Sequence, residues 1–178
     1  MEKILNELVE NNNIRTNLSS LRQAIKEDVQ KQQLLAQMEK YADMFLSFLK
    51  NDDAKTRKNA ALLLGDLAYQ DAVDALYEAY VSETTLFVKA AYLQAMEALD
   101  VTDKLPALKE MLAKLLETET TVENKKHVEE EIRALRKIMI QAEGIRRHTP
   151  DIKGKKVTVI LFTNRTQRET IRRTIDCG

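Results

Sequence analysis

Residues 57–76 read RKNAALLLGDLAYQDAVDAL, and residues 89–108, which begin 32 positions later, read KAAYLQAMEALDVTDKLPAL. The two stretches align without a gap, and residues of the same kind recur at matched places: Leu64 with Met96, Leu67 with Leu99, Asp71 with Asp103, Val73 with Leu105, and Leu76 with Leu108. Half of a third copy precedes them, from Tyr41 to Phe48. A fixed period of this length is typical of an architecture made of stacked helix pairs.

The repeat register predicts two helices in each unit. The first helices are expected at about 39–50, 71–82 and 103–116, and the second helices at about 54–69, 85–100 and 124–142. The breaks hold residues that start helices, such as Asn51-Asp52-Asp53 before Ala54, because their side chains accept hydrogen bonds from free backbone N–H groups. Pro106 falls in the first turn of its helix, where its missing N–H costs little. The sequence therefore predicts a mostly α fold, an α-solenoid or α–α superhelix.

Two helices are expected before the first unit. Residues 2–10 have apolar side chains at helical spacing, and the run Asn11-Asn12-Asn13 ends them. A second helix of about five turns is expected to begin among Thr16–Ser20 and to reach Leu35. Its apolar side would hold Leu18, Leu21, Ile25 and Val29. Such atypical helices suit the end of a stack, where the outer face meets water.

The stretch around the first full unit resembles a known repeat family. The matching residues are Asn51-Asp52-Asp53, Arg57, Ala60-Ala61, Leu64-Gly65, Leu67, Asp71-Ala72-Val73 and Ala75-Leu76. Together they are similar to the consensus of a HEAT-like repeat, and the resemblance extends over about residues 41–112. It implies stacked helix pairs whose inner, concave face holds protein or nucleic acid, and it implies no chemistry.

Composition supports helices and reveals a division of charge. The chain has 178 residues, which suffice for one core with a small appendage, and it has 4 Gly, 2 Pro and no Trp, too few turn residues for an all-β fold. Its formal net charge is zero, yet residues from Lys125 onward hold 14 Lys/Arg against 7 Asp/Glu. Residues 144–175 alone hold nine Lys/Arg and two acids. This imbalance indicates an anionic partner such as RNA or DNA, or else a solvated basic surface.

The chain changes character after Arg147. Residues 148–156, HTPDIKGKK, read as a linker, and residues 157–162, VTVILF, have the length and composition of a buried strand. A helix is expected over 165–175. Since a lone strand leaves its backbone groups unpaired, we expect its partner to come from another copy of the chain or from a sheet domain that begins near Lys155 in a longer protein. We favour the second, and divide the chain into a helical-repeat domain (1–146) and a linker with a strand–helix extension (147–178).

A helical-repeat region followed by the linker and the VTVILFTNR strand resembles the front end of bacterial RNA methylases. In those proteins an accessory RNA-binding region precedes the catalytic fold. The resemblance implies that a site for the methyl donor S-adenosylmethionine, with the catalytic residues, would lie outside this chain.

No residue pattern predicts a catalytic, metal or cofactor site. His127 and His148 lack partners at metal-binding spacing, the four glycines are isolated, and Cys177 has no positioned base. Glu129-Glu130-Glu131 reads as a solvated helix face, because consecutive helical residues point in different directions. The recurring aromatic residues are expected in the core: Tyr41, Phe48, Tyr77 and Tyr80.

The basic residues near the C-terminal end are the candidate nucleic-acid-binding residues. They are Arg146, Arg147, Lys153, Lys155, Lys156, Arg165, Arg168 and Arg172. Phosphates attract such a surface without sequence being read. The alternative is structural charge, since Glu169 is spaced to pair with Arg165. Arg57, Lys58 and Lys89, which lie near or at one repeat position, are equally explained by pairing with the turn acids Asp52 and Asp53.

These observations predict a non-catalytic macromolecule-binding module that binds protein or RNA. One hypothesis makes it the N-terminal accessory region of an RNA methyltransferase, and the alternative makes it a protein–protein scaffold with no role in nucleic-acid binding. An independent small enzyme would need a set of residues that the sequence lacks. The chain shows neither a secretory signal nor an apolar run long enough to span a membrane, so a cytoplasmic location is expected.

Overall fold

The computed structural model describes residues 1–117, 125–142, 145–148, 151–152, 155–156 and 159–162, the last four ranges through their backbone alone. Within these ranges the chain forms nine α-helices: α1 (Glu2–Val9), α2 (Ile14–Ala24), α3 (Asp28–Leu35), α4 (Met38–Ser47), α5 (Ala54–Asp66), α6 (Val73–Ser82), α7 (Leu86–Glu97), α8 (Leu105–Glu117) and α9 (Lys125–Ala142). Short 3-10 turns follow α4 (η1, Phe48–Lys50) and precede α6 (η2, Gln70–Ala72) and α8 (η3, Thr102–Lys104). The part described with its side chains is all-α.

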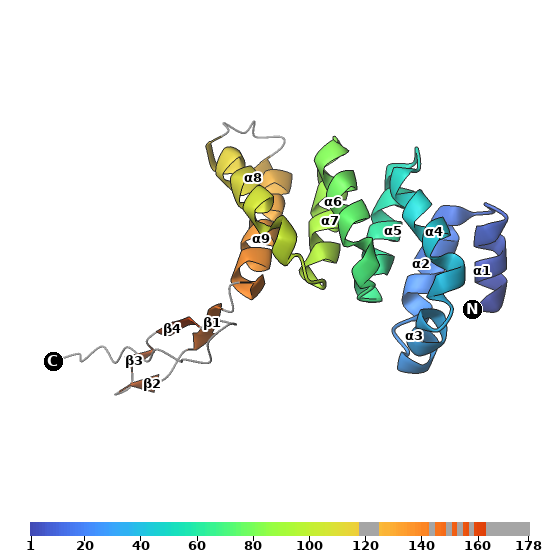
Figure 1. The fold of residues 1–178 in the computed structure, drawn as a ribbon, viewed down its shortest axis with the longest axis horizontal. Coiled ribbons are helices and arrows are strands. Elements are labelled where there is room, and N and C mark those ends of the chain that lie inside the picture. The colour runs from blue at the N-terminus through green and yellow to red at the C-terminus, as the bar shows by residue number, and fades with distance from the viewer. Residues whose placement is uncertain (118–124, 143–144, 149–150, 153–154, 157–158, 163–178) are drawn as a thin grey trace.

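The three predicted hairpins are confirmed as α4–α5, α6–α7 and α8–α9. They stand one after another in chain order, from the α1–α2 hairpin at the N-terminal end to α9, as Figure 1 shows. Asp53 caps the first of the second helices as predicted: its carboxylate accepts a hydrogen bond from the backbone N–H of Thr56 at 2.8 Å. The acid in the turn therefore fixes where α5 begins.

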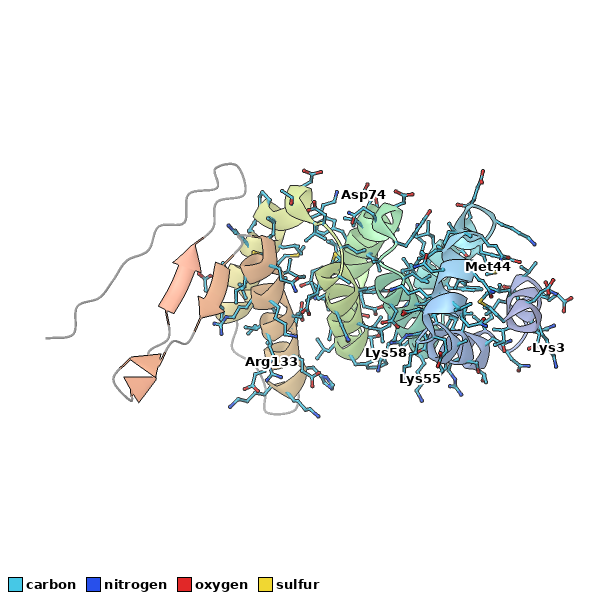
Figure 2. The ribbon with its side chains drawn as sticks, turned by 90° about the horizontal axis from the view of Figure 1, so that it is seen from below. Lys3, Met44, Lys55, Lys58, Asp74 and Arg133 are labelled. Atoms are coloured by element: carbon cyan, nitrogen blue, oxygen red, sulfur yellow. The ribbon has the colours of Figure 1, made fainter. Side chains whose placement is uncertain are left out.

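The second helices of the hairpins form one continuous layer. α2 packs on α5, α5 on α7, and α7 on α9, and we call these four helices the second-helix layer. The approach of α5 to α7 is close because Gly65 has no side chain: a Cβ there would lie 2.7 Å from the Cα of Ala95. In Figure 2, Lys58 of α5 and Arg133 of α9 lie along one edge of the molecule, and Asp74 of α6 lies along the opposite edge.

A single apolar cluster runs through the stack, from Leu5 of α1 to Met139 of α9. Each unit contributes residues that the periodicity marked, and three of the four recurring aromatic residues, Tyr41, Phe48 and Tyr80, are buried, while Tyr77 is half-buried against the cluster. The prediction that these rings are core residues is confirmed. Since each hairpin buries its apolar side against its neighbours, no hairpin is an independent domain.

The expected five-turn helix before the first unit is wrong. The chain forms two shorter helices instead, α2 and α3, and α2 begins after Asn13, whose φ of 46° is left-handed. The backbone N–H groups of Lys26 and Glu27 bond to carbonyls three residues back, which ends α2. Beyond that point the apolar pattern fails, because Val29 is 68% exposed and α3 buries Leu34 alone.

Four short strands follow α9: β1 (Ile145–His148), β2 (Asp151–Ile152), β3 (Lys155–Lys156) and β4 (Val159–Phe162). β1 pairs with β4 in antiparallel register, and β2 pairs with β3. β4 coincides with the end of the predicted strand, but its partner is not supplied from outside as expected. The chain turns back on itself, so the strand pairs with residues just after α9. The predicted helix over 165–175 lies outside the described residues.

Candidate interaction surface

Arg57 of α5 joins the first unit to the second. Its guanidinium donates to the Glu83 carboxylate through Nε at 2.7 Å and through Nη2 at 3.0 Å, and Nη1 donates to the carbonyl oxygens of Asn51 and Asp52. The hydrogen bond to Glu83 holds the pKa of Arg57 above its usual value. Burial by itself raises the pKa of Glu83, but the bonds from Arg57 and Thr85 outweigh it, so the net pKa is lowered. Such a two-point contact fixes the angle between adjacent hairpins.

Tyr92 of α7 completes this contact between the units. Its hydroxyl donates to the carbonyl oxygen of Leu49 at 2.9 Å, and burial raises the pKa of Tyr92 to about 12. The turn after α4 is therefore held by a guanidinium and a phenol, each provided by a second helix. Because these groups already donate to acceptors within the protein, they have few hydrogen-bond donors left for a ligand.

The contact between the second and third units is built around Glu131 of α9. Its carboxylate accepts a hydrogen bond from the Tyr80 hydroxyl at 2.6 Å and lies 3.3 Å from the Lys89 ammonium nitrogen, which also sits 5.1 Å from the centre of the Tyr80 ring. Burial, followed by the contact with Glu131, raises the pKa of Tyr80. The interpretation of Glu129–Glu131 as a solvated face is therefore wrong for Glu131, which is 1% exposed.

The expected pairing of repeat-position cations with turn acids is also corrected. Arg57 and Lys89 occupy one repeat position, 32 residues apart, and each reaches a carboxylate of the following unit. Asp52 contributes its carbonyl oxygen alone, and the Asp53 carboxylate is occupied by Thr56. Stacking places a carboxylate of the next hairpin closer to each cation than the carboxylates of the cation's own turn are.

Charge is unevenly distributed between the two kinds of helix. The second-helix layer carries eleven Lys/Arg and five Asp/Glu, whereas α4, α6 and α8 carry three Lys/Arg and six Asp/Glu. At the C-terminal ends of the second helices, two ion pairs cross between neighbours: Arg22–Asp66 at 2.8 Å and Lys137–Glu97 at 3.4 Å. Positive charge that remains uncompensated is therefore concentrated toward the N-terminal ends of these helices.

A shallow hollow of about 450 Å³ crosses the same layer, from α5 over α7 to α9. Ala95 and Ala98 contribute small side chains to it, Gly65 contributes backbone, and Gln94 and Gln141 contribute amides. It is open and polar, without the enclosed apolar lining that small-molecule sites need. The hollow suits a side chain or a segment of a larger partner.

The predicted basic site is seen in part, and through its backbone alone. Arg146 and Arg147 lie in β1, and Lys155 and Lys156 lie in β3. The remaining candidates, Lys153, Arg165, Arg168 and Arg172, lie outside the described residues. Nucleic-acid binding by these eight residues stays a prediction.

Neither histidine forms a metal site in the part of the chain that is described. His127 lies on α9, with Nδ1 3.5 Å from the Glu130 carboxylate, and His148 lies in β1. Among the described residues, no group of three or more His, Cys, Asp or Glu could hold a metal ion. The described helices include none with the length and apolar character required to cross a membrane.

Residues 42–118 match the model of a protein family described as HEAT repeats. They form a HEAT repeat region. The match runs from within α4 to the end of α8, across the first two hairpins and the first helix of the third, which agrees with the expectation drawn from residues 41–112. No curated protein and no solved structure matches the chain, and nothing in the comparisons supports the resemblance to RNA methylases.

Proposed function

We propose that this chain is a non-catalytic binding module that holds another protein on the exposed side of its second-helix layer. The observation that supports the proposal is the continuity of this layer. Four helices from successive units lie side by side, and the side of each that faces away from the apolar cluster stays outside the core. HEAT repeats typically serve as binding scaffolds. A rigid stack can present such a surface with little loss of entropy on binding.

The test is to block the surface and measure complex formation. The full chain would be used to isolate partner proteins from the cells that produce it, and binding would then be measured with the purified partner. Ala90→Trp with Gln94→Trp on α7 should weaken binding at least tenfold, since large side chains fill the middle of the surface. Glu39→Trp with Glu110→Trp, on α4 and α8, should leave it within twofold. Equal effects of the two pairs would refute the proposal.

A second candidate function follows from the basic residues of 144–175. In this alternative the chain is the accessory region of an RNA methyltransferase, and the methyl-donor site and catalytic residues belong to another part of the protein. The nine Lys/Arg against two acids favour contact with phosphates. Binding of a structured RNA hairpin should then fall steeply between low and physiological salt, and on charge reversal at Arg146, Arg147 and Lys155. An affinity independent of salt would exclude it.

A further inference from the structure

Four basic side chains on the second-helix layer have no acidic partner among the described residues. Lys55 and Lys58 lie near the start of α5, and Lys126 and Arg133 lie on α9; we call these two pairs the α5 rail and the α9 rail. Lys55, Lys126 and Arg133 are exposed, and Lys58 is half-buried. In Figure 2 the three labelled members, Lys55, Lys58 and Arg133, lie along the same edge of the molecule.

Of the seven other cations of the layer, Arg15, Lys125 and Arg136 also lack an ion pair among the described residues, whereas four are paired. Arg22, Arg57, Lys89 and Lys137 each lie within ion-pair distance of a carboxylate on another helix or turn. Those four cations stabilise the stack, whereas the rails face solvent. Near the α9 rail in sequence, Glu131 is buried against Tyr80 and Lys89, Glu130 sits beside His127, and Glu129 is exposed and forms no ion pair among the described residues. Since an unpaired cluster of like charges repels itself, its presence on one face points to an anionic partner.

α7 lies between the rails, and the one cation in its N-terminal half, Lys89, is paired with the buried Glu131 carboxylate. It packs on both α5 and α9, and its N-terminal half offers Phe87 and Ala90, both half-buried. Lys58 lies over the Phe87 ring, 6.0 Å from its centre. The surface is thus a narrow apolar strip bordered by cations on both sides.

This pattern fits an acidic polypeptide better than a nucleic acid. Single-stranded nucleic acid needs exposed aromatic faces for its bases and cations along every phosphate. Here the aromatic ring is half-buried beneath a lysine, and the strip between the rails is apolar. A polypeptide that lies across α7 can place an apolar side chain on the strip and carboxylates toward both rails, which are two interhelical spacings of about 8–10 Å apart.

We propose that the two rails bind an acidic segment of a partner protein, with an apolar side chain of that segment lying against Phe87 and Ala90. The inference rests on the proposed function and specifies the chemistry of the partner. The carboxylates of the segment neutralise the four cations, and the apolar contact fixes where the segment lies along the surface. Because three of the four cations are exposed, their contribution to binding weakens as salt screens it.

The experiment measures fluorescence anisotropy of labelled probes with the full chain at low and physiological salt. The probes are a 12-residue peptide repeating Glu-Glu-Leu, the same peptide with Ser in place of Leu, and a 12-nucleotide oligouridylate. The leucine peptide should bind, and the serine peptide should bind about tenfold more weakly, because a buried leucine side chain is lost. No binding of the leucine peptide at low salt, or tighter binding of oligouridylate, would overturn the proposal.

Matched variants test whether the rails are the site. Lys58→Glu with Arg133→Glu should weaken binding of the leucine peptide at least tenfold. Lys40→Glu with Lys114→Glu makes the same change in net charge on α4 and α8, and should change affinity less than twofold. Circular dichroism and thermal unfolding would show that both variants fold. An equal loss in the two variants would mean non-specific attraction and would reject the rails.

The two proposals fail in different ways. If Ala90→Trp with Gln94→Trp abolishes binding of the purified partner protein but Lys58→Glu with Arg133→Glu does not, the proposal for the rails is refuted and the binding surface stands. If neither pair affects partner binding, the surface itself is refuted.

Discussion

Glu131 shows how much one buried carboxylate can depend on its neighbours. It is held by the Tyr80 hydroxyl and the Lys89 ammonium, while its Oε2 and the Nδ1 of His127, one turn earlier, are buried without a hydrogen-bond partner. A charge in this position is tolerated because two groups from the preceding unit converge on it. A change at Glu131 therefore tests the contact between the second and third units.

Replacing Glu131 by alanine should lower the free energy of unfolding by about 2–4 kcal/mol, because the buried Tyr80 hydroxyl and the half-buried Lys89 lose their partner. Urea unfolding followed by circular dichroism measures the change. Glu130→Ala, the neighbouring and largely solvated carboxylate, should change stability by about 0.5 kcal/mol or less. Similar losses in the two variants would show that Glu131 does not hold the units together.

Ala68 gives a second prediction at a single residue. It follows the end of α5 with a φ of 53°, and the N–H groups of Ala68 and Tyr69 bond back to the carbonyl oxygens of Gly65 and Leu64. Glycine normally fills this position, because a Cβ is strained in the left-handed region. Ala68→Gly should therefore stabilise the protein by about 0.5–1 kcal/mol, as measured by the urea midpoint.

The matched control is Ala98, which ends α7 with a right-handed φ of −82°. Ala98→Gly relieves no strain and adds freedom to the unfolded chain, so it should destabilise by about 0.5–1 kcal/mol. If both glycine variants shift stability in the same direction, the strain at Ala68 is not the cause.

At the scale of the helices, contacts between hairpins carry the pH dependence. The pKa of Glu83 lies below its ordinary 4.5, so its carboxylate stabilises the folded state above that pH. The stabilisation is lost as the pH falls through the lowered pKa, because Glu83 must then take up a proton and release Arg57. α5 and α6–α7 should separate more easily in acid.

The direction of this pH dependence of stability can be tested with Glu83→Gln. The difference in unfolding free energy between wild type and variant should be greatest above about pH 5 and should shrink toward pH 3. Urea midpoints collected across that range give the difference at each pH. A constant difference from pH 3 to pH 7 would mean that the Glu83 charge contributes nothing to the contact.

At the scale of the whole molecule, the stack is quasi-one-dimensional, so a defect should have local consequences that depend on its place. Leu108 of α8 and Leu64 of α5 are both 0% exposed, and each should cost about 2–5 kcal/mol when truncated to alanine. Leu108→Ala should open α8 and α9 and leave α2 and α5 protected, since the last hairpin has one described neighbour.

Hydrogen exchange read by mass spectrometry distinguishes these outcomes. Leu64→Ala, in the middle of the stack, should raise exchange on both sides of α5. Uniform loss of protection in both variants would show that the nine described helices unfold as one cooperative unit.

Several features were within reach of the sequence because they depend on neighbours along the chain. The 32-residue period predicted the hairpins α4–α5 and α6–α7 and the helix α8, the acid before α5 predicted its start, and the recurring aromatic residues marked the core. The break between α2 and α3 was missed because the apolar spacing from Ile25 to Val29 looks helical, although Val29 faces solvent. Glu131 was missed because the three glutamates were interpreted by residue type, although Glu131 lies three residues after Val128 and four before Leu135, on the buried face of α9.

The sequence by itself determined that this protein is a stack of helix hairpins with a HEAT-like core, since hydrophobic periodicity is a local property that survives without knowledge of the fold. Tertiary structure alone decided which charges hold the stack and which face outward. Arg57 meets a carboxylate 26 residues away and Tyr80 meets one 51 residues away. Those pairings form because stacking sets the distances between hairpins. The two rails, whose four cations have no acidic partner among the described residues, define the surface that we propose for binding.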